Sequence, residues 1–272
     1  MGKRETKTAG RGKGKVRGNG RGPASRSRSR RFGFPIPNSL FPEQGRASAF
    51  SRAVRAWFRK NGRSLPWRET RDPYRVLVSE AMLQQTQVSR VVDYYDRFLT
   101  RFPTLEALAA ARPRQVRESW EGLGYYARAR NLHALARQVD GALPSDPEAL
   151  RELPGVGAYT AGAVASFAFE QRAALVDTNV ARVLRRAFAP RADFKTSKGA
   201  RRIWAIAEAV LPRGGRATWT HNQAIMELGA LICTSRVARC GECPAMRHCR
   251  TGMGNGEKGE GKQRKAGKGK GA

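Results

Sequence analysis

The sequence predicts an all-α protein. Helix-starting pairs such as Asp72-Pro73 and Asp146-Pro147 recur along the chain, and apolar residues at the spacing of a helix face follow each of them. Segments with the alternating pattern of a half-buried strand are nearly absent. The connections between the predicted helices are short, and we find no internal repeat. We therefore expect a series of helices packed on one another.

The first predicted helix, over residues 48–61, is amphipathic and is stopped by Gly62. An apolar helix follows over 72–83. The remaining helices are expected over residues 88–98, 104–111, 113–122, 126–139, 146–153, 158–168, 177–188, 197–210 and 219–232.

The charge of the chain predicts a polyanionic partner. Its 272 residues carry a formal net charge of +30 and are 40% hydrophobic, enough for a substantial core. Residues 1–45 and 251–272 are rich in Gly, Lys and Arg with little to bury, so we expect both to be disordered basic tails. Lys and Arg also outnumber acidic residues between the tails. We expect a helical core over residues 46–232 and a cysteine-containing loop over 233–250.

No apolar run approaches the length that crosses a bilayer, and the N-terminus has no hydrophobic signal core. These features predict an intracellular protein, in the cytoplasm or associated with the nucleoid, without a membrane partner. We expect a monomer. In a reducing compartment the four cysteines are not expected to form disulfides.

A tight helical hairpin is predicted between the helices at 146–153 and 158–168. Pro154 stops the first helix, while Gly155 and Gly157 allow a sharp turn with no Cβ in the way. Backbone amides at the start of the second helix then form an anion site that suits a phosphate. An ordinary helix connection is the alternative. The aspartate at the next helix start and the downstream cysteines favour the functional interpretation.

The cysteines predict a metal centre. Cys233, Cys240, Cys243 and Cys249 follow a helix with the spacing C-x6-C-x2-C-x5-C. Four thiolates in so short a loop can enclose either zinc or a [4Fe–4S] cluster. Zinc ribbons usually pair two short Cys-x2-Cys turns, whereas only one such pair is present here, so the spacing favours the cluster.

Together these features resemble the helix-hairpin-helix DNA glycosylase superfamily with its [4Fe–4S] loop. Four further segments resemble the A/G-specific adenine glycosylases of the MutY type, and the resemblance covers roughly residues 48–250. The segments are 65–68 (LPWR), 79–88 (SEAMLQQTQV), 122–132 (GLGYYARARNL) and 222–230 (NQAIMELGA). The resemblance implies a two-lobed helical fold with the catalytic cleft between the lobes. One lobe would combine residues 46–70 with 181–232 and the cluster loop.

Glu80 is the expected general acid. Its helix has no clearly polar face, because Val76, Leu77, Met82 and Leu83 surround it in sequence. Burial there would raise the pKa of Glu80 and keep it protonated. The alternative is a surface carboxylate paired with an arginine. The resemblance implies that Glu80 protonates adenine and later assists water.

Asp177 starts a helix, where an aspartate is usually only an N-cap. The resemblance instead implies that Asp177 stabilises the cationic sugar and that Asn179 positions the carboxylates. Thr178 stands where the family commonly has glycine, and its side chain narrows the space between Asp177 and Asn179. Tyr159 occupies the place of the lysine of endonuclease III type lyases, so no Schiff base is expected. Its hydroxyl could hydrogen-bond the general acid.

The resemblance also implies which residues meet DNA. Gln85 and Tyr125 match the wedge residues that fill the gap left by a flipped base. The hairpin residues Gly155, Val156 and Gly157 would meet the DNA backbone. Four residues match the adenine pocket: Arg63, Leu65, Trp67 and Gln223. Packing or solvation is the alternative role for each of them.

The expected function is removal of adenine opposite guanine or 8-oxoguanine in double-stranded DNA that carries mispaired or oxidised bases. Two alternatives remain, a thymine or uracil mismatch glycosylase, which can also carry the tyrosine seen at Tyr159, and a non-catalytic DNA-binding protein. Adenine glycosylases usually have a Nudix-like C-terminal domain that reads 8-oxoguanine. Nothing after Cys249 resembles it, so adenine removal is better supported than selectivity for 8-oxoguanine.

Overall fold

The computed structural model describes residues 42–254, which all lie in one compact unit. This part of the chain is helical, and its only β-type pairing is an isolated bridge between Cys233 and Ala238. The prediction of a helical fold is confirmed. The main helices are α1 (Gln44–Asn61), α2 (Pro73–Leu83), α3 (Val88–Arg101), α4 (Leu105–Ala110), α5 (Pro113–Ser119), α6 (Ala127–Gln138), α7 (Pro147–Arg151), α8 (Ala158–Phe167), α9 (Thr178–Phe188), α10 (Ser197–Val210) and α11 (Gly215–Leu231).

Side-chain caps start many of these helices where the sequence predicts them. The carboxylate of Asp72 accepts a hydrogen bond from the amide of Arg75 ahead of α2, and Asp146 accepts two at the start of α7. Thr104 and Thr196 cap α4 and α10 in the same way. Each cap satisfies backbone donors that the helix itself leaves free, which sets the starting residue.

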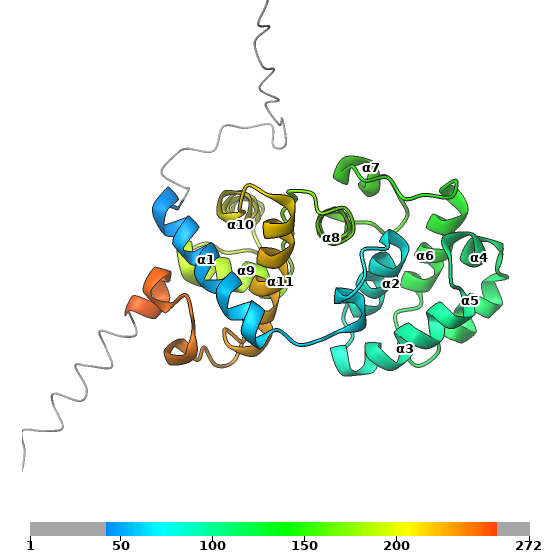
Figure 1. The fold of residues 1–272 in the computed structure, drawn as a ribbon, viewed down its shortest axis with the longest axis horizontal. Coiled ribbons are helices and arrows are strands. Elements are labelled where there is room, and N and C mark those ends of the chain that lie inside the picture. The colour runs from blue at the N-terminus through cyan, green and yellow to red at the C-terminus, as the bar shows by residue number, and fades with distance from the viewer. Residues whose placement is uncertain (1–41, 255–272) are drawn as a thin grey trace, which may run out of the picture. The chain divides into compact units, whose positions relative to one another are not determined.

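The helices pack as two groups joined through α8. In one group α1 packs on α10 and α11, and α9 packs on the same two helices; in the other, α2 contacts α3 and α6, while α4 and α5 pack on α6. The buried helix α8 contacts α2 and α7 from the second group and α11 from the first. Figure 1 shows α8 between the two groups. Residues from both groups can therefore meet beside α8.

Aromatic pairs mark the interior of each group. Phe50 of α1 meets Phe188 of α9 with ring centroids 5.1 Å apart, and Phe98 of α3 meets Trp120 at 5.7 Å. Both pairs are edge-to-face, the geometry that aromatic rings prefer.

Some helix boundaries differ from the expected ones. α11 begins at Gly215, ahead of the expected Trp219, because Gly214 in extended conformation starts it without a side-chain cap. α5 ends at Ser119, since the chain turns at Gly122 with φ of +89°. The predicted tails lie outside the described residues except at their inner ends. There the expected disorder is wrong, because α1 begins at Gln44 and residues 251–254 are helical. Within residues 42–254, no helix has the length and apolar character needed to cross a membrane.

Candidate active site

Glu80 lies in the interior on α2. The residue is 3% exposed, and its Oε2 atom has no hydrogen-bond partner among the described residues. Burial raises the pKa of Glu80 from 4.5 to about 7, and the negative charge of Asp177 adds to this rise, while Tyr159 and Arg68 oppose it. The Glu80 carboxyl group is therefore protonated in a large share of the protein molecules at neutral pH.

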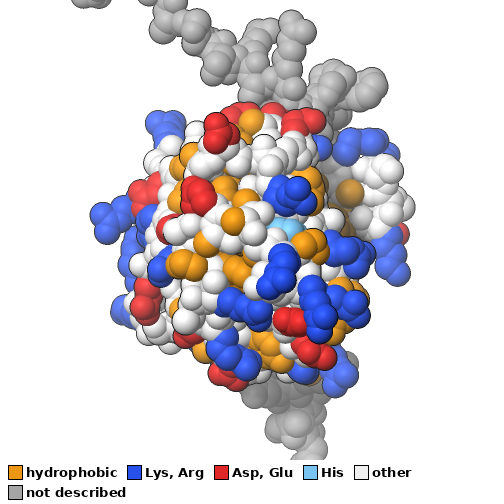
Figure 2. Space-filling view, turned by 90° about the vertical axis from the view of Figure 1, so that its right-hand side faces the viewer, with side chains coloured by type: hydrophobic (Ala, Val, Ile, Leu, Met, Phe, Trp, Pro, Cys, Tyr) orange, Lys and Arg blue, Asp and Glu red, His pale blue; other side chains and the backbone are white. Residues whose placement is uncertain are grey.

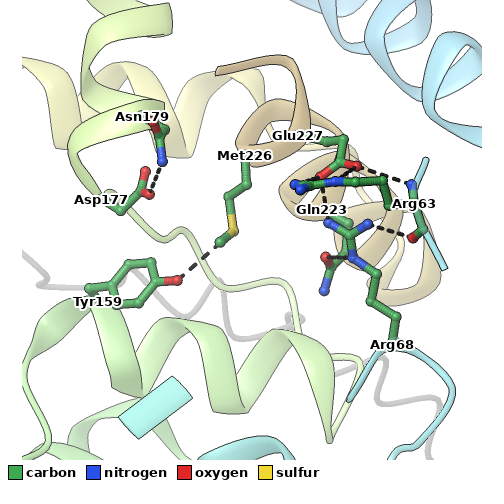
Figure 3. A network of polar contacts seen from close by, with 8 residues as sticks. All are labelled: Arg63, Arg68, Tyr159, Asp177, Asn179, Gln223, Met226 and Glu227. Carbon is green, nitrogen blue, oxygen red and sulfur yellow. Dashed lines mark hydrogen bonds and ion pairs between the residues drawn. The ribbon is translucent and has the colours of Figure 1, made fainter. Parts of the chain in front are cut away.

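Asp177 and Tyr159 approach this site from two other helices. Asp177 is the N-cap of α9: its Oδ1 accepts a hydrogen bond of 2.6 Å from the amide of Val180, and its Oδ2 accepts one of 3.0 Å from Asn179. Burial raises the pKa of Asp177 against these hydrogen bonds. Tyr159, on the first turn of α8, lies near Asp177, and its hydroxyl points to the sulfur atom of Met226 at 4.0 Å (Figure 3). Burial together with Glu80 and Asp177 raises the pKa of Tyr159 well above 10. The fold thus gathers groups from α2, α8 and α9.

Asn179 connects Asp177 to the cysteine loop. Arg182 donates a hydrogen bond of 2.8 Å to Oδ1 of Asn179 and another of 2.8 Å to the carbonyl oxygen of Cys233. The Asn179 amide is therefore held with its nitrogen toward Asp177. This role of Arg182 is not evident in the sequence, because the amphipathic pattern of its helix contains no signal for it.

A second polar network joins the loop after α1 to α11. Glu227 is 0% exposed; Arg63 contacts it through Nε and Nη2 at 2.7 and 2.8 Å, and Arg68 through Nη2 at 2.9 Å. Burial raises the pKa of Glu227, but hydrogen bonds from both arginines outweigh it and lower the pKa to about 2. Arg68 Nε also donates to Oε1 of Gln223 at 2.8 Å (Figure 3), which leaves the amide nitrogen of Gln223 as the free donor.

The predicted base-pocket residues therefore differ in whether they are hydrogen-bonded to other side chains or buried in the core. Arg63 is engaged by Glu227, whereas Leu65 and Trp67 are buried on either side of Pro66, and Trp67 packs edge-on against Tyr95 at 5.5 Å. Arg68 and Glu227, which were not predicted from the sequence, are also members of this network. Glu227 carries the same signal that identified Glu80, a carboxylate within an apolar helix.

The two predicted wedge residues share an unusual backbone conformation. Gln85 has φ of +58° and Tyr125 has φ of +49°, and both are exposed, Tyr125 to 57%. In residues 42–254, Glu170 is the one other non-glycine residue with positive φ. Such backbones are strained in residues with a Cβ and are held by their surroundings.

Arg128 supplies that support and was missed by sequence analysis. It is 8% exposed, and its guanidinium lies 5.4 Å from the ring centre of Tyr125. Its position on the apolar stripe of α6, with Leu132 and Leu135, was the available signal. Its Nη atoms donate to the carbonyl oxygens of Ala81, Met82, Gln84, Leu123 and Gly124. One side chain thus ties the segment ending in Gln85 to the segment ending in Tyr125.

The hairpin before α8 exposes the backbone of Gly155 and Gly157 to solvent, while the side chain of Val156 is buried. Gly155 has φ of +76°, and an added Cβ would lie 2.6 Å from Cβ of Asn131. Gly157 has φ of −86°, and an added Cβ there would meet open space. The expectation that both glycines make the sharp turn is therefore wrong for Gly157. The side chain of Val156 is buried, its amide donates to Leu153, and no side chain caps α8.

The cysteine loop receives donors on two of its sulfur atoms. Arg186 Nη1 lies 3.3 Å from Sγ of Cys233, and the amide of Gly252 lies 3.4 Å from Sγ of Cys249. Burial raises the pKa of Cys243, and the other three thiols add to the rise, so the four share one neighbourhood. Within the described part of the chain, no three Cys, His, Asp or Glu side chains are arranged to hold a single metal ion.

A hairpin that leads into an uncapped helix α8, whose Tyr159 interacts with the buried acid Glu80 and with Asp177, is typical of the helix-hairpin-helix class of proteins. A family model described as "HhH-GPD superfamily base excision DNA repair protein" matches residues 78–209. The adenine DNA glycosylase of Mycolicibacterium smegmatis is 44% identical over 200 residues, covering 72% of this chain and 67% of that protein. The chain belongs to the HhH-GPD superfamily.

Two further comparisons support this placement. The adenine DNA glycosylase of Rattus norvegicus is 43% identical over 227 residues, which cover 79% of this chain and 44% of that protein. The chain thus spans about half the length of some relatives. A solved thermostable thymine-DNA glycosylase is 30% identical, with a TM-score of 0.70 over 77% of this chain and 98% of the other.

Proposed function

We propose that this protein is a monofunctional DNA glycosylase that hydrolyses the N-glycosidic bond of adenine mispaired with guanine or 8-oxoguanine. The observation that carries the proposal is the pairing of buried Glu80, whose pKa is about 7, with Asp177 beside it. Relatives named adenine DNA glycosylase at 43% and 44% identity support adenine as the base.

Glu80 is suited to the departure of adenine. The bond between the sugar C1′ and the base nitrogen breaks as protonated Glu80 gives its proton to a ring nitrogen of adenine, which would otherwise leave as an anion. Water then adds to C1′, and its proton returns to the Glu80 carboxylate. No other side chain among the described residues hydrogen-bonds Oε2 of Glu80, so none competes with the base or the water for this atom.

Asp177 is suited to the positive charge that develops on the sugar. Its carboxylate is held by the Val180 amide and by Asn179, so it need not reorganise when the charge appears. Tyr159 stands beside both carboxyl groups, and its hydroxyl cannot form a Schiff base. We therefore propose hydrolysis without strand cleavage by the enzyme itself.

Access to the base requires that it leave the duplex. Gln85 and Tyr125 are exposed on segments joined by Arg128, and we propose that they fill the vacated position. The uncapped start of α8, with Gly157 open to close approach, suits a DNA phosphate. The free amide nitrogen of Gln223 is a donor for the extruded base.

We propose that the four cysteines hold a [4Fe–4S] cluster. Donors from Arg186 and Gly252 suit thiolate ligands, and the four thiols lie close enough together to raise the pKa of Cys243, as the ligands of one cluster would. When bound, the cluster would order the loop that Arg182 connects to Asn179. The chemistry on the base requires none of its electrons.

Single-turnover cleavage of duplexes tests the proposal. Matched duplexes would carry A·8-oxoguanine, A·G, A·C, T·G or U·G, and alkali would convert each abasic site to a break. Breaks at adenine are expected, and the rates opposite 8-oxoguanine and guanine give the lesion preference of this chain. Breaks at thymine or uracil would instead support the second candidate, which the likeness to the thymine-DNA glycosylase favours.

A further inference from the structure

A large hollow on the described part of the chain lies outside the candidate active site, between α5 and α6. Its volume is about 810 Å³, within the range of sites that bind ligands or side-chain clusters. Its floor is formed mostly by apolar groups from Pro113, Val116, Tyr126 and Ala129. None of the catalytic or base-pocket residues lines it.

Arginines surround this hollow. Arg114 and Arg117 project from α5, while Arg130 and Arg137 project from α6, and all four are exposed. Arg114 pairs with Glu118, and Arg117 lies over the ring of Tyr126, whereas Arg130 and Arg137 have no acidic partner among residues 42–254. Figure 2 shows this side of the molecule, where Lys and Arg side chains gather near apolar ones.

His133 lies at the wall of the hollow. It is 7% exposed, and its Nε2 atom, which is itself buried, has no hydrogen-bond partner in the described part of the chain. A side chain bound in the hollow would therefore lie beside this ring.

We propose that the α5–α6 groove is a docking site for an acidic peptide segment of another protein, one that inserts apolar side chains between carboxylates. The lining of α6 recurs at helical spacing from Tyr126 to Ala129, His133 and Arg137, a face about 17 Å long. A helical segment of about fifteen residues covers such a face with apolar anchors one turn apart. The basic N- and C-terminal segments of this chain have the wrong charge to fill it.

DNA fits the groove less well than a peptide. Contacts with phosphates require exposed cations along a continuous path, whereas this floor is apolar and hollowed. The pairing of an apolar floor with a cationic rim instead matches a partner whose own apolar side chains are flanked by Asp and Glu.

The test begins with a displayed library of random peptides of about fifteen residues. Peptides are selected on the full chain and counter-selected on the Arg130→Glu/Arg137→Glu variant. The selected peptides are then synthesised and titrated by fluorescence anisotropy. The matched control is Arg52→Glu/Arg59→Glu, which makes the same charge change at the same spacing on exposed positions of α1.

We expect acidic peptides with apolar residues at helical spacing. They should lose about tenfold or more in affinity with Arg130→Glu/Arg137→Glu, and less than about twofold with the control. Ala134→Trp, which fills the exposed groove without changing charge, should weaken binding equally. Bound peptide should also shift the ring nitrogen resonances of His133 in ¹⁵N-histidine protein.

Three results would overturn the proposal. The first is that no peptide survives counter-selection. The second is that the surviving peptides lack acidic residues, and the third is that they bind the two charge variants equally. Titration of the same two charge variants with undamaged duplex DNA tests whether the groove binds DNA instead of a peptide. If Arg130→Glu/Arg137→Glu weakens duplex binding more than the control does and lowers the salt slope by about 2, the groove is part of the DNA path.

Discussion

Asn179 donates a hydrogen bond of 3.0 Å to Oδ2 of Asp177, while its own carbonyl accepts one of 2.8 Å from Arg182. Asp177 is thus both the helix cap that sequence alone favours and a carboxylate held beside Glu80. The two roles do not exclude each other. They can be separated by substitution.

Asp177→Asn should abolish single-turnover cleavage while leaving the fold and the DNA affinity nearly unchanged, because asparagine also caps helices well. Asp177→Ala should lose the same activity and about 1 kcal/mol of unfolding free energy besides. Urea unfolding and duplex titration would be measured for both. A collapsed Asp177→Asn variant would mean that capping is the whole role.

Cleavage by the wild type should fall as pH rises through about 7, because Glu80 must be protonated to donate. Glu80→Gln should be inactive across the range. A rate that rises above pH 7 would contradict the assignment of Glu80 as general acid. The rates would be measured under single-turnover conditions, so that product release does not mask the proton transfer.

The raised pKa of Glu80, which suits catalysis, also predicts a loss of stability as pH rises. Between pH 4.5 and about 7 the folded state still holds the Glu80 proton that the unfolded chain has released, so burial of Glu80 lowers the unfolding free energy as pH rises. Above about 7 this loss is complete. Glu80→Gln should therefore gain about 3 kcal/mol relative to wild type between pH 4 and pH 8. Parallel pH profiles of unfolding would show no such divergence if Glu80 were ionised in the folded state.

Arg128→Lys should weaken the support of both wedge segments, since one ammonium cannot reach the same set of carbonyl oxygens. We expect a loss of about 2 kcal/mol in unfolding free energy, as buried acceptors lose their donor. We also expect slower base extrusion, followed with 2-aminopurine fluorescence. Arg130→Lys, exposed on the same helix, is the matched control. Equal extrusion rates for the two variants would show that Arg128 does not position the wedge.

The two hairpin glycines should respond differently to alanine. Gly155→Ala forces a Cβ against Asn131 at positive φ and should cost about 2 kcal/mol of stability. Gly157→Ala should fold within about 0.5 kcal/mol of wild type. Its new methyl group points into open space, so it should weaken duplex binding if a phosphate approaches there. Unchanged binding by folded Gly157→Ala would remove this turn from the DNA interface.

Purified protein should contain iron and be brown, with the visible absorbance of an iron–sulfur cluster. Cys243→Ser should lose both. Arg186→Gln should keep the iron but lose the donor to Cys233 and become easier to bleach with oxidant. A colourless preparation that contains zinc would contradict the proposed cluster.

The local chemistry of the sequence determined which segments become helices and which residues stand out within them. Caps such as Asp72 and Thr196 act at short range, so helix starts follow from neighbouring residues. Glu80 stood out for a similar reason, because a carboxylate within an apolar helix is anomalous wherever that helix packs.

The tertiary structure alone decided which distant groups meet. Arg63 and Arg68 reach Glu227 across more than 150 residues of sequence, and Arg128 reaches Met82 from another helix. Such contacts depend on where whole helices pack, which no local pattern encodes. For the same reason Gly155 and Gly157 are indistinguishable in sequence, yet the proximity of Asn131 constrains one of them and leaves the other open.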